Sequence, residues 1–430
     1  MRGDVVALTA ISYMVFFYNL FLRFYTMGLR IASIWNPKAR LWVLGRKSLM
    51  HNIISDMANG TGPVIWMHCA SLGEFEQGRP VLEQLKKTYV GHRIILTFFS
   101  PSGYEIRKNN SGADYVYYLP MDGKRNAAAF LDAVQPKLVI FVKYESWYHY
   151  LSTLHQRKIP TLLISAIFKS EQNFFGPLGS FLRSMLENYT HIFVQDKDSL
   201  DLLKKFGVRG ACSVAGDTRF DRVQEIINQP FNHHSIENFC TDEEVLVAGS
   251  TWDEDEEMLS AASNEFPSLK LIIAPHEVNP AVIEKTQLRF KDSILLSALE
   301  AGKNSSNSRV LVIDCVGMLS KLYRFSTVCY VGGGFNKAGI HNILEAAAYG
   351  RVVLFGPNYQ RSAEAGELIK LGAGFSCSRQ GEFTGFLGRM LEDKIEREKK
   401  NNIAKEFVET NLGSAEKIMR YIEKNLLLSN

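Results

Sequence analysis

Residues 67–76 read MHCASLGEFE, and in this stretch an apolar strand runs into a glycine turn and then into a helix. The preceding residues 63–67, PVIWM, are short and apolar, as expected of a buried parallel strand, and Val81 and Leu85 recur afterwards at helical spacing. The pattern therefore places the carboxylate of Glu74 at the carboxyl edge of a sheet, where open α/β folds bind their ligands.

Glu74 has a structural interpretation as well as a functional one. Ser71 and Glu74 are three residues apart at the start of the helix, which is the spacing of a capping box. In that motif the Ser71 hydroxyl caps the helix, and Glu74 accepts a hydrogen bond from the backbone N–H of Ser71. The local pattern by itself favours this structural role, so the rest of the chain has to decide between the two.

Length and composition predict a folded protein of two domains. A chain of 430 residues is too long for one ordinary core. Hydrophobic residues make up 46% and charged residues 22%, which is typical of a globular protein and not of a disordered one. The cysteines are far apart, never form C-x-x-C and mostly fall in apolar runs. They are expected to be reduced core residues, and neither disulfides nor a metal site is expected.

Positive charge is concentrated at the N-terminus. Residues 1–50 contain seven Lys or Arg and one acidic residue, Asp4, so that residues 51–430 are slightly acidic. Proteins that bind nucleic acid usually spread positive charge over a folded face. The distribution therefore argues against nucleic acid as a partner and predicts contact with an anionic membrane surface.

Residues 5–22 contain no charged residue and are just long enough to span or deeply enter a bilayer. A cleaved signal peptide is the alternative, but the apolar run is longer than a usual signal core and no A-x-A-like site follows it. Arg2 and Asp4 balance before the segment, whereas several cations follow it. The positive-inside rule then predicts a membrane-associated N-terminal helix with the body of the protein in the cytoplasm.

Apolar strand-like runs alternate with helical patterns along residues 63–215 and again along residues 244–355. This alternation predicts two βαβ series, each with a parallel sheet. The expected strands are 63–67, 93–98, 115–119, 138–142, 161–165 and 191–195 in the first series, and 244–248, 269–274, 310–314, 328–331 and 352–355 in the second.

Two further patterns set the expected boundaries. Residues 222–242 lose strong periodicity, and residues 402–427 have the pattern of an amphipathic helix. The expected segments are a membrane anchor with its basic flank at 1–50, an N-terminal domain at 51–222, a linker at 223–242, a C-terminal domain at 243–401 and a C-terminal helix at 402–430.

A glycine-rich loop follows an expected strand in the second series. Residues 332–339 read GGGFNKAG and lead into a helix expected to begin near Asn342. Glycines let backbone N–H groups approach an anion, and a helix adds its positive end. Asn342 and Glu345 share a helix face, so Glu345 could accept ribose hydroxyls while Asn342 meets a phosphate or base. The alternative is a helix cap with a solvated glutamate.

Two other strand ends carry candidate residues. Ser250 and Thr251 follow the first strand of the second series and could contact phosphate, although Thr251 and Glu254 also have capping-box spacing. In the first series Glu145 follows a strand and is expected at the same sheet edge as Glu74, where a structural ion pair is equally available.

Five motifs occur in order along the chain, and together they resemble the 3-deoxy-D-manno-octulosonic acid (Kdo) transferases of Gram-negative lipopolysaccharide synthesis. They are ASLGE at 70–74, QPKLVI at 135–140, GDTRFD at 216–221, AGST at 248–251, and the glycine loop with HNILE at 341–345. The resemblance covers essentially the whole chain. It implies a GT-B fold, in which two Rossmann-like domains enclose a cleft, the acceptor binds to the N-terminal domain, the nucleotide sugar binds to the C-terminal domain, and a final helix crosses back.

The resemblance also implies roles for residues of the first domain. Glu74 matches the catalytic base, and Glu145 matches a second essential acid of the acceptor-side cleft. Ser71 and Gly73 are expected on the acceptor side. The family's Asn-Ala-Arg reads Ser-Ala-Ile at residues 165–167, so the acceptor contacts differ here.

The donor side follows from the same resemblance. The residues implied to bind CMP-Kdo are Arg219, Ser250, Thr251, His276, Gly333, Gly334, Asn342 and Glu345. Arg219 stands where the family usually has a lysine, which keeps the charge but alters the geometry. The family's Pro-Arg-His reads Pro-His-Glu at residues 275–277, so that His276 only partly replaces a phosphate-binding arginine.

The expected function is an inverting transfer of Kdo from CMP-Kdo to a lipid A precursor similar to lipid IVA, without metal or cofactor, at the cytoplasmic face of the inner membrane. Two alternatives remain. Another GT-B enzyme, such as a nucleotide-sugar 2-epimerase, would share the glycine loop. Such a soluble enzyme would not need the apolar segment 5–22 or the basic residues that flank it. A non-enzymatic two-domain sugar-binding protein would require export, against which the charged flanks argue.

Overall fold

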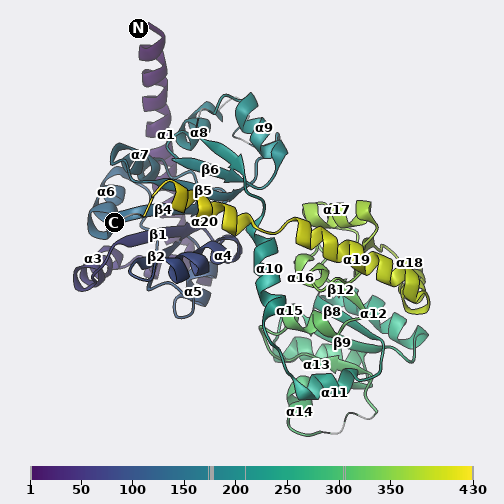
Figure 1. Ribbon diagram of the computed structural model, residues 1–430. Coiled ribbons are helices and arrows are strands. Elements are labelled where there is room, and N and C mark those ends of the chain that lie inside the picture. The colour runs from purple at the N-terminus through teal and green to yellow at the C-terminus, as the bar shows by residue number, and fades with distance from the viewer. Residues whose placement is uncertain are drawn as a thin grey trace. The chain divides into compact units, whose positions relative to one another are not determined.

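The computed structural model describes residues 2–172, 174, 179–208, 210–303, 305 and 307–428, with side chains from Tyr13 onward. The chain divides into two compact units (Figure 1). Unit 1 comprises Met1–Arg222 and Gly413–Asn430, and unit 2 comprises Val223–Leu412.

Unit 1 is built around a parallel sheet, in which the described residues form seven strands in the order β3-β2-β1-β4-β5-β6-β7. The strands are β1 (Val64–Cys69), β2 (Arg93–Phe98), β3 (Tyr115–Tyr118), β4 (Pro136–Val142), β5 (Thr161–Ala166), β6 (His191–Val194) and β7 (Cys212–Val214). The helices that follow them are α4 (Leu72–Thr88), α5 (Pro101–Arg107), α6 (Lys124–Val134), α7 (Tyr148–Gln156), α8 (Gly179–Leu186) and α9 (Lys197–Lys205).

The side chains of β1 alternate between two cores. Val64 and Trp66 lie in one hydrophobic cluster, whereas Ile65, Met67 and Cys69 lie in another on the opposite face of the sheet. Both faces are therefore covered, which explains why the strand is continuously apolar in sequence.

The strand order of unit 1 reverses between β1 and β4, because the chain first runs outward to β2 and β3 and then returns to the other side of β1. Such a topological switch point opens a crevice at the carboxyl ends of the two strands, where α/β proteins bind ligands. The predicted residues Glu74 and Glu145 follow these two strands.

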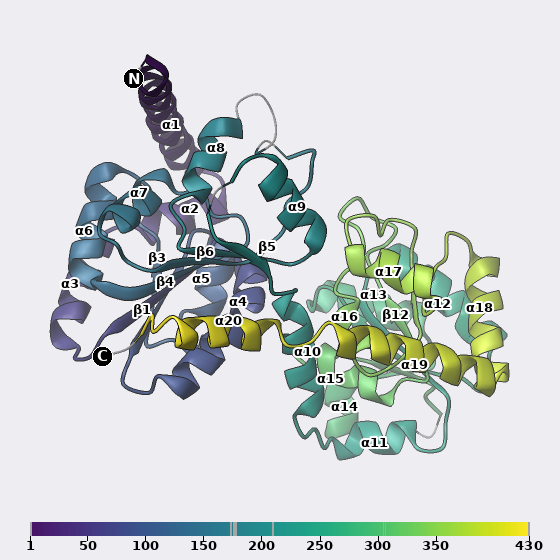
Figure 2. The same cartoon turned by 45° about the horizontal axis from the view of Figure 1, so that its top comes forward.

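Three helices precede the first sheet, namely α1 (Arg2–Ala32), α2 (Pro37–Leu44) and α3 (Leu49–Asn59). Figures 1 and 2 show α1 projecting from unit 1. Of the predicted apolar segment 5–22, the side chains before Tyr13 lie outside the described ones. Among the residues that the structure describes, no helix combines the length and the apolar character needed to cross a membrane.

Unit 2 repeats the architecture of unit 1. Its parallel sheet has, in the described residues, the strand order β10-β11-β9-β8-β12-β13-β14, with the switch point between β8 and β12. The strands are β8 (Val245–Thr251), β9 (Lys270–Pro275), β10 (Ser293–Leu295), β11 (Val310–Val312), β12 (Val328–Val331), β13 (Val353–Phe355) and β14 (Gly374–Ser376). The helices are α12 (Asp253–Glu265), α13 (Pro280–Arg289), α14 (Leu296–Glu300), α15 (Leu319–Leu322), α16 (Leu344–Ala347), α17 (Ala363–Leu371), α18 (Gln380–Glu392) and α19 (Lys394–Thr410), with a 3-10 turn η2 (Tyr323–Phe325).

Three short strands, β7, β10 and β14, were not predicted. Each has three residues of which at most one is buried, so no apolar run marks it in the sequence, whereas β11 and β13 are equally short but fully buried and were predicted. The expected linker at 223–242 is mostly helical, since it contains the end of α10 (Thr218–Asn228) and α11 (His234–Cys240). Ile236 and Phe239 of α11 are buried, which explains why this stretch is folded.

The predicted helix at 402–427 is two helices. It comprises the end of α19 and a separate helix α20 (Ser414–Lys424), with Gly413 between them at a φ of 90°, a left-handed conformation that suits glycine. Asp221 accepts hydrogen bonds from the backbone N–H groups of Gly413 and Ala415, at 2.7 and 2.8 Å. The buried face of α20 joins the core cluster of unit 1, so the end of the chain returns to the first unit (Figure 2).

Candidate active site

Glu74 lies in the first turn of α4, directly after β1, and is partly exposed. Its carboxylate oxygen Oε2 accepts a hydrogen bond from the Ser71 hydroxyl. Ser71 is the N-cap residue but makes no side-chain capping hydrogen bond, because its hydroxyl is turned to the carboxylate and not to the backbone. The capping box considered from the sequence is therefore wrong in its Ser71 half.

Glu145 is buried at the end of β4, with 3% of its surface exposed. The indole N–H of Trp147 donates to Oε2 of Glu145, and the Tyr189 hydroxyl donates to the Glu145 backbone carbonyl at 2.7 Å. His68 Nε2 lies 3.4 Å from the same carboxylate oxygen. Both the backbone and the carboxylate of Glu145 are thus fixed by neighbouring side chains.

Sequence reasoning missed His68, which is fully buried on β1. Thr97 Oγ1 accepts the indole N–H of Trp66 at 2.8 Å and lies 2.8 Å from His68 Nδ1. The Thr97 hydroxyl therefore engages Nδ1 of His68, and Nε2 is the ring nitrogen that faces Glu145. The signal in the sequence is a histidine inside an otherwise apolar strand.

The two carboxylates belong to one electrostatic environment around the end of β1. Burial raises the pKa of the Cys69 thiol well above its usual value, and the negative charges of Glu145 and Glu74 raise it further. Gly73 is exposed, and a Cβ there would meet open space apart from Ser71 Oγ at 3.8 Å. Glycine at this position is therefore not required by packing.

Arg219 lies in the first turn of α10 and belongs to unit 1, whereas the other predicted donor residues lie in unit 2. Its Nε and Nη2 donate to Asp217 Oδ2 at 2.8 and 2.6 Å, and its backbone N–H donates to Asp217 Oδ1 at 2.9 Å. Asp217 thus orients the guanidinium of Arg219.

The glycine loop of unit 2 is held by a buried carboxylate that the sequence analysis missed. Asp255 Oδ2 accepts the backbone N–H groups of Gly333 and Trp252, both at 2.9 Å, and Oδ1 accepts the Tyr330 hydroxyl at 2.6 Å. Burial raises the pKa of Asp255, while these hydrogen bonds lower it. The Gly333 N–H is therefore occupied within the protein, contrary to the simplest expectation for an anion-binding loop.

Close packing explains two of the loop glycines. Gly333 has a φ of 89°, and a Cβ there would lie 2.8 Å from the Gly339 carbonyl oxygen. Gly334 packs against Gly356, whose Cα would be 2.5 Å from a Cβ on Gly334. These glycines shape the end of β12, and any side chain in either place would displace backbone.

The pair Thr251 and Glu254 does not form the predicted capping box, because α12 begins two residues after Thr251 and Asp255 accepts the Trp252 N–H instead. Thr251 is buried, and its hydroxyl donates to Glu256 Oε1 at 3.0 Å. Ser250 is partly exposed with a φ of 54°, so that of these two hydroxyl residues Ser250 is the more accessible at the sheet edge.

Three aromatic rings form a stack at the carboxyl ends of β8 and β9. The ring of His276 stacks on both Trp252 and His341, with ring centroids 4.7 and 4.2 Å away, while the centroids of Trp252 and His341 are 6.5 Å apart in nearly parallel planes. The Trp252 indole N–H donates to His341 Nε2 at 3.1 Å, and burial together with the His276 charge lowers the pKa of His341 to about 4. His341 is therefore neutral at pH 7, while His276 is exposed.

Asn342 and Glu345 lie side by side, as their spacing predicts. The Asn342 side-chain amide donates to Glu345 Oε1 at 2.9 Å, and Asn342 Oδ1 accepts the Leu344 N–H at 3.2 Å. The helix itself starts at Leu344, later than expected, and is short. Within the described residues, no group of three or more His, Cys, Asp or Glu side chains is arranged to hold a metal ion.

The fold is shared with solved structures of other proteins. A UDP-GlcNAc 2-epimerase from Neisseria meningitidis matches with a TM-score of 0.57 and 17% identity over 84% of this chain and 100% of its own. Acinetobacter baumannii MurG matches with a TM-score of 0.51 and 15% identity over 85% of this chain and 100% of its own. The architecture is thus of the GT-B type, two Rossmann-like units in one chain.

Sequence comparisons indicate which GT-B proteins this chain resembles. Residues 45–222 match the family model of 3-deoxy-D-manno-octulosonic-acid transferase. The transferase of that name from Aquifex aeolicus is 29% identical over 77% of this chain and 87% of its own length, and the one from Haemophilus influenzae is 24% identical over 92% and 95%. Over these ranges the chain is similar to the Kdo transferases.

Proposed function

We propose that this protein is an inverting glycosyltransferase that transfers Kdo from CMP-Kdo to a lipid A precursor similar to lipid IVA. The similarity of residues 45–222 to the Kdo transferase family model, and of most of the chain to the curated transferases, supports the transfer of Kdo. The observation that carries the proposal in this chain is the pair Glu74 and Glu145, which follow the two strands on either side of the switch point in unit 1.

Glu74 is assigned as the base. The acceptor hydroxyl oxygen forms a bond to the anomeric carbon of Kdo, while the bond from that carbon to the CMP phosphate oxygen breaks and CMP leaves with the electron pair. The hydroxyl proton goes to Glu74, whose partly exposed carboxylate is oriented by Ser71 through Oε2. Proton transfer to a positioned carboxylate is a general way of lowering such a barrier.

Glu145 is assigned to the binding of acceptor hydroxyl groups beside the base. A buried carboxylate that already has the Trp147 indole and His68 as neighbours is held in one orientation, so it can position an acceptor hydroxyl without reorganising. Ser71 and Gly73 complete this side, since Gly73 leaves open space for a substrate next to Glu74.

The donor is assigned to the sheet edge of unit 2. Glu345 and Asn342 form one polar pair for the ribose and base of CMP, and the exposed His276 offers its imidazole to the phosphate. Arg219, in unit 1, is assigned to the donor's negative charge, with Asp217 orienting its guanidinium. These groups stabilise the negative charge that develops on CMP.

A location at the cytoplasmic face of the inner membrane belongs to the same proposal. Phe16, Phe17, Phe21 and Phe24 of α1 are each about 60% exposed, which is unusual for large apolar side chains in water. A lipid surface would cover them, and the cations that follow would meet anionic headgroups.

The proposal is tested with Glu74→Gln, which keeps the size and the hydrogen bond from Ser71 but removes the base. We expect transfer of Kdo from CMP-Kdo to a tetra-acylated acceptor, measured by mass spectrometry of the product, to fall by about 100-fold or more. The melting temperature should not change. Glu83→Gln is the matched control, since Glu83 lies on the same helix and is 38% exposed. Transfer by Glu74→Gln at a rate near that of the parent protein would exclude Glu74 as the base.

A further inference from the structure

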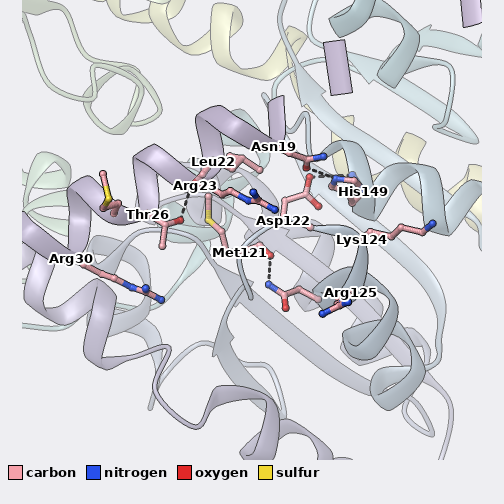
Figure 3. Close-up of a pocket in the computed structure, with 13 residues that line it drawn as sticks. Asn19, Leu22, Arg23, Thr26, Arg30, Met121, Asp122, Lys124, Arg125 and His149 are labelled. Atoms are coloured by element: carbon pink, nitrogen blue, oxygen red, sulfur yellow. Dashed lines mark hydrogen bonds between the residues drawn. The ribbon is translucent and has the colours of Figure 1, made fainter. Parts of the chain in front are cut away.

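A pocket of about 800 Å³ lies in unit 1, lined by residues of α1, of the first turn of α6 and of the start of α7. Figure 3 shows Arg23, Thr26 and Arg30 on the α1 side, and Lys124 and Arg125 on the side of α6. Neither the sequence motifs nor the proposed chemistry uses these residues.

Positive charge in this pocket is not neutralised by the protein. Arg23, Arg30, Lys124 and Arg125 are exposed, and among the described residues none of them forms an ion pair. Asp122 is the acidic residue among those that line the pocket.

The carboxylate of Asp122 is already satisfied from within the protein. Oδ2 accepts the Tyr18 hydroxyl at 2.6 Å and the His149 backbone N–H at 3.1 Å, and Oδ1 accepts the Tyr150 backbone N–H at 3.2 Å. The pocket is therefore lined by four cations and by one carboxylate, Asp122, whose oxygens already accept hydrogen bonds from the protein. Such an arrangement favours an anionic ligand.

The start of α6 adds further donors. Gly123 is its N-cap residue and makes no side-chain capping hydrogen bond, and Gly123, Lys124 and Arg125 all line the pocket. The first N–H groups of an α-helix have no acceptor within the helix itself. The 11-residue helix also directs the positive end of its dipole there. Backbone N–H groups combined with Arg and Lys are the usual ligands of a phosphate group.

The surroundings of the pocket indicate which phosphate compound it takes. Arg23 and Arg30 alternate along α1 with the exposed apolar residues Phe21, Phe24 and Met27. A ligand bound here would have its phosphate beside the cations and apolar groups along the helix, as a lipid does.

We propose that this pocket binds the phosphate monoester of a membrane-lipid headgroup and so fixes the depth and orientation of unit 1 at the bilayer. The inference rests on the membrane location proposed above but not on the transfer reaction. A monoester is preferred because its second ionisation lets several cations act on one group.

The test measures lipid binding by the full chain in neutral detergent micelles without CMP-Kdo, so that its outcome is independent of catalysis. Phosphatidic acid is titrated, and its apparent affinity is taken from the rise in melting temperature. The double variant Arg23→Gln/Arg30→Gln should weaken binding by about tenfold or more, as expected for the loss of two charge-assisted contacts.

The matched control is Lys38→Gln/Arg40→Gln. It removes the same charge from exposed residues of the basic flank that do not line the pocket. We expect less than about a threefold change, because distant surface charges act weakly. Equal losses in the two double variants would overturn the proposal in favour of unspecific attraction.

Two further titrations distinguish the source of the phosphate. Phosphatidylglycerol carries a diester, and binding as strong as that of phosphatidic acid would exclude selection of a monoester. Inorganic phosphate alone, if it stabilised the protein as much at the same concentration, would assign the pocket to free phosphate and exclude a lipid headgroup. The expected result is that phosphatidic acid exceeds both.

Discussion

The Tyr18 hydroxyl on α1 donates a hydrogen bond of 2.6 Å to Asp122 Oδ2, joining residues 104 positions apart in the chain. Beside it, Asn19 Oδ1 lies 2.7 Å from His149 Nε2. These contacts hold the N-terminal helix against the loop before α6 and against α7, and Arg23 and Arg30 of the same helix line the pocket of Figure 3.

Asp122→Asn should therefore loosen α1 from unit 1. Two acceptor oxygens become one, so the Tyr18 hydroxyl or a backbone N–H group loses its partner inside the protein. We expect the free energy of unfolding to fall by about 1–3 kcal/mol and protease cleavage near α1 to increase. Asp132→Asn on α6 is the control, because Asp132 is 66% exposed and should change stability by less than about 0.5 kcal/mol. Unchanged cleavage of Asp122→Asn would show that this carboxylate does not hold α1.

Trp147→Phe tests whether Glu145 must be oriented. The substitution keeps an aromatic ring near Phe99 but removes the N–H donor to the Glu145 carboxylate. We expect transfer to slow by about tenfold, because a buried carboxylate that loses a donor turns to another partner. Trp35→Phe is the control, since Trp35 is 69% exposed and distant in sequence from the site. A normal rate in Trp147→Phe would mean that His68 and the backbone suffice to orient Glu145.

The lowered pKa of His341 predicts how the stability of the protein depends on pH. Its pKa is lowered from 6.5 to about 4 in the folded protein, so between these values the unfolded chain binds a proton that the native state does not. The free energy of unfolding therefore decreases as the pH falls from 6.5 toward 4. Because the ring is partly exposed, the contribution is discounted to about 1–2 kcal/mol.

The measurement is chemical denaturation at pH 7 and at pH 5, for the parent protein and for His341→Gln. The variant should lose less stability between the two pH values, because glutamine does not titrate. If both proteins lost the same amount, the pH dependence would have to come from other groups.

The sequence predicted a large part of the fold because long buried strands leave a clear pattern. The run at 93–98 was predicted with the bounds that the structure has, since five of its six residues are buried. The edge strands β7, β10 and β14 were missed because at most one residue in each is buried, which leaves no apolar run in the sequence. The stretch at 223–242 was taken for a linker because α11 buries only Ile236 and Phe239 in a short polar helix.

The candidate site, like the fold, was predicted only in part from the sequence. The motifs identified Glu74, Glu145, Asn342 and Glu345 as candidate site residues. In the structure, Asn342 and Glu345 are in contact. The supporting residues of the site were not predicted, because His68, Thr97 and Asp255 are single polar residues whose partners lie on other strands. Capping was misassigned at Thr251 because the start of a helix differs by one or two residues from what a pattern indicates.

The sequence by itself determined that this chain has two parallel α/β units and that carboxylates and glycines follow their strands, because periodicity and turn residues are local properties. Only the tertiary structure decided where the side-chain hydrogen bonds go. Ser71 turned out to bind the Glu74 carboxylate and not the helix backbone, and Asp255 took the Gly333 N–H. Both outcomes depend on distances between atoms, which are fixed when strands and helices pack and which no spacing along the chain specifies.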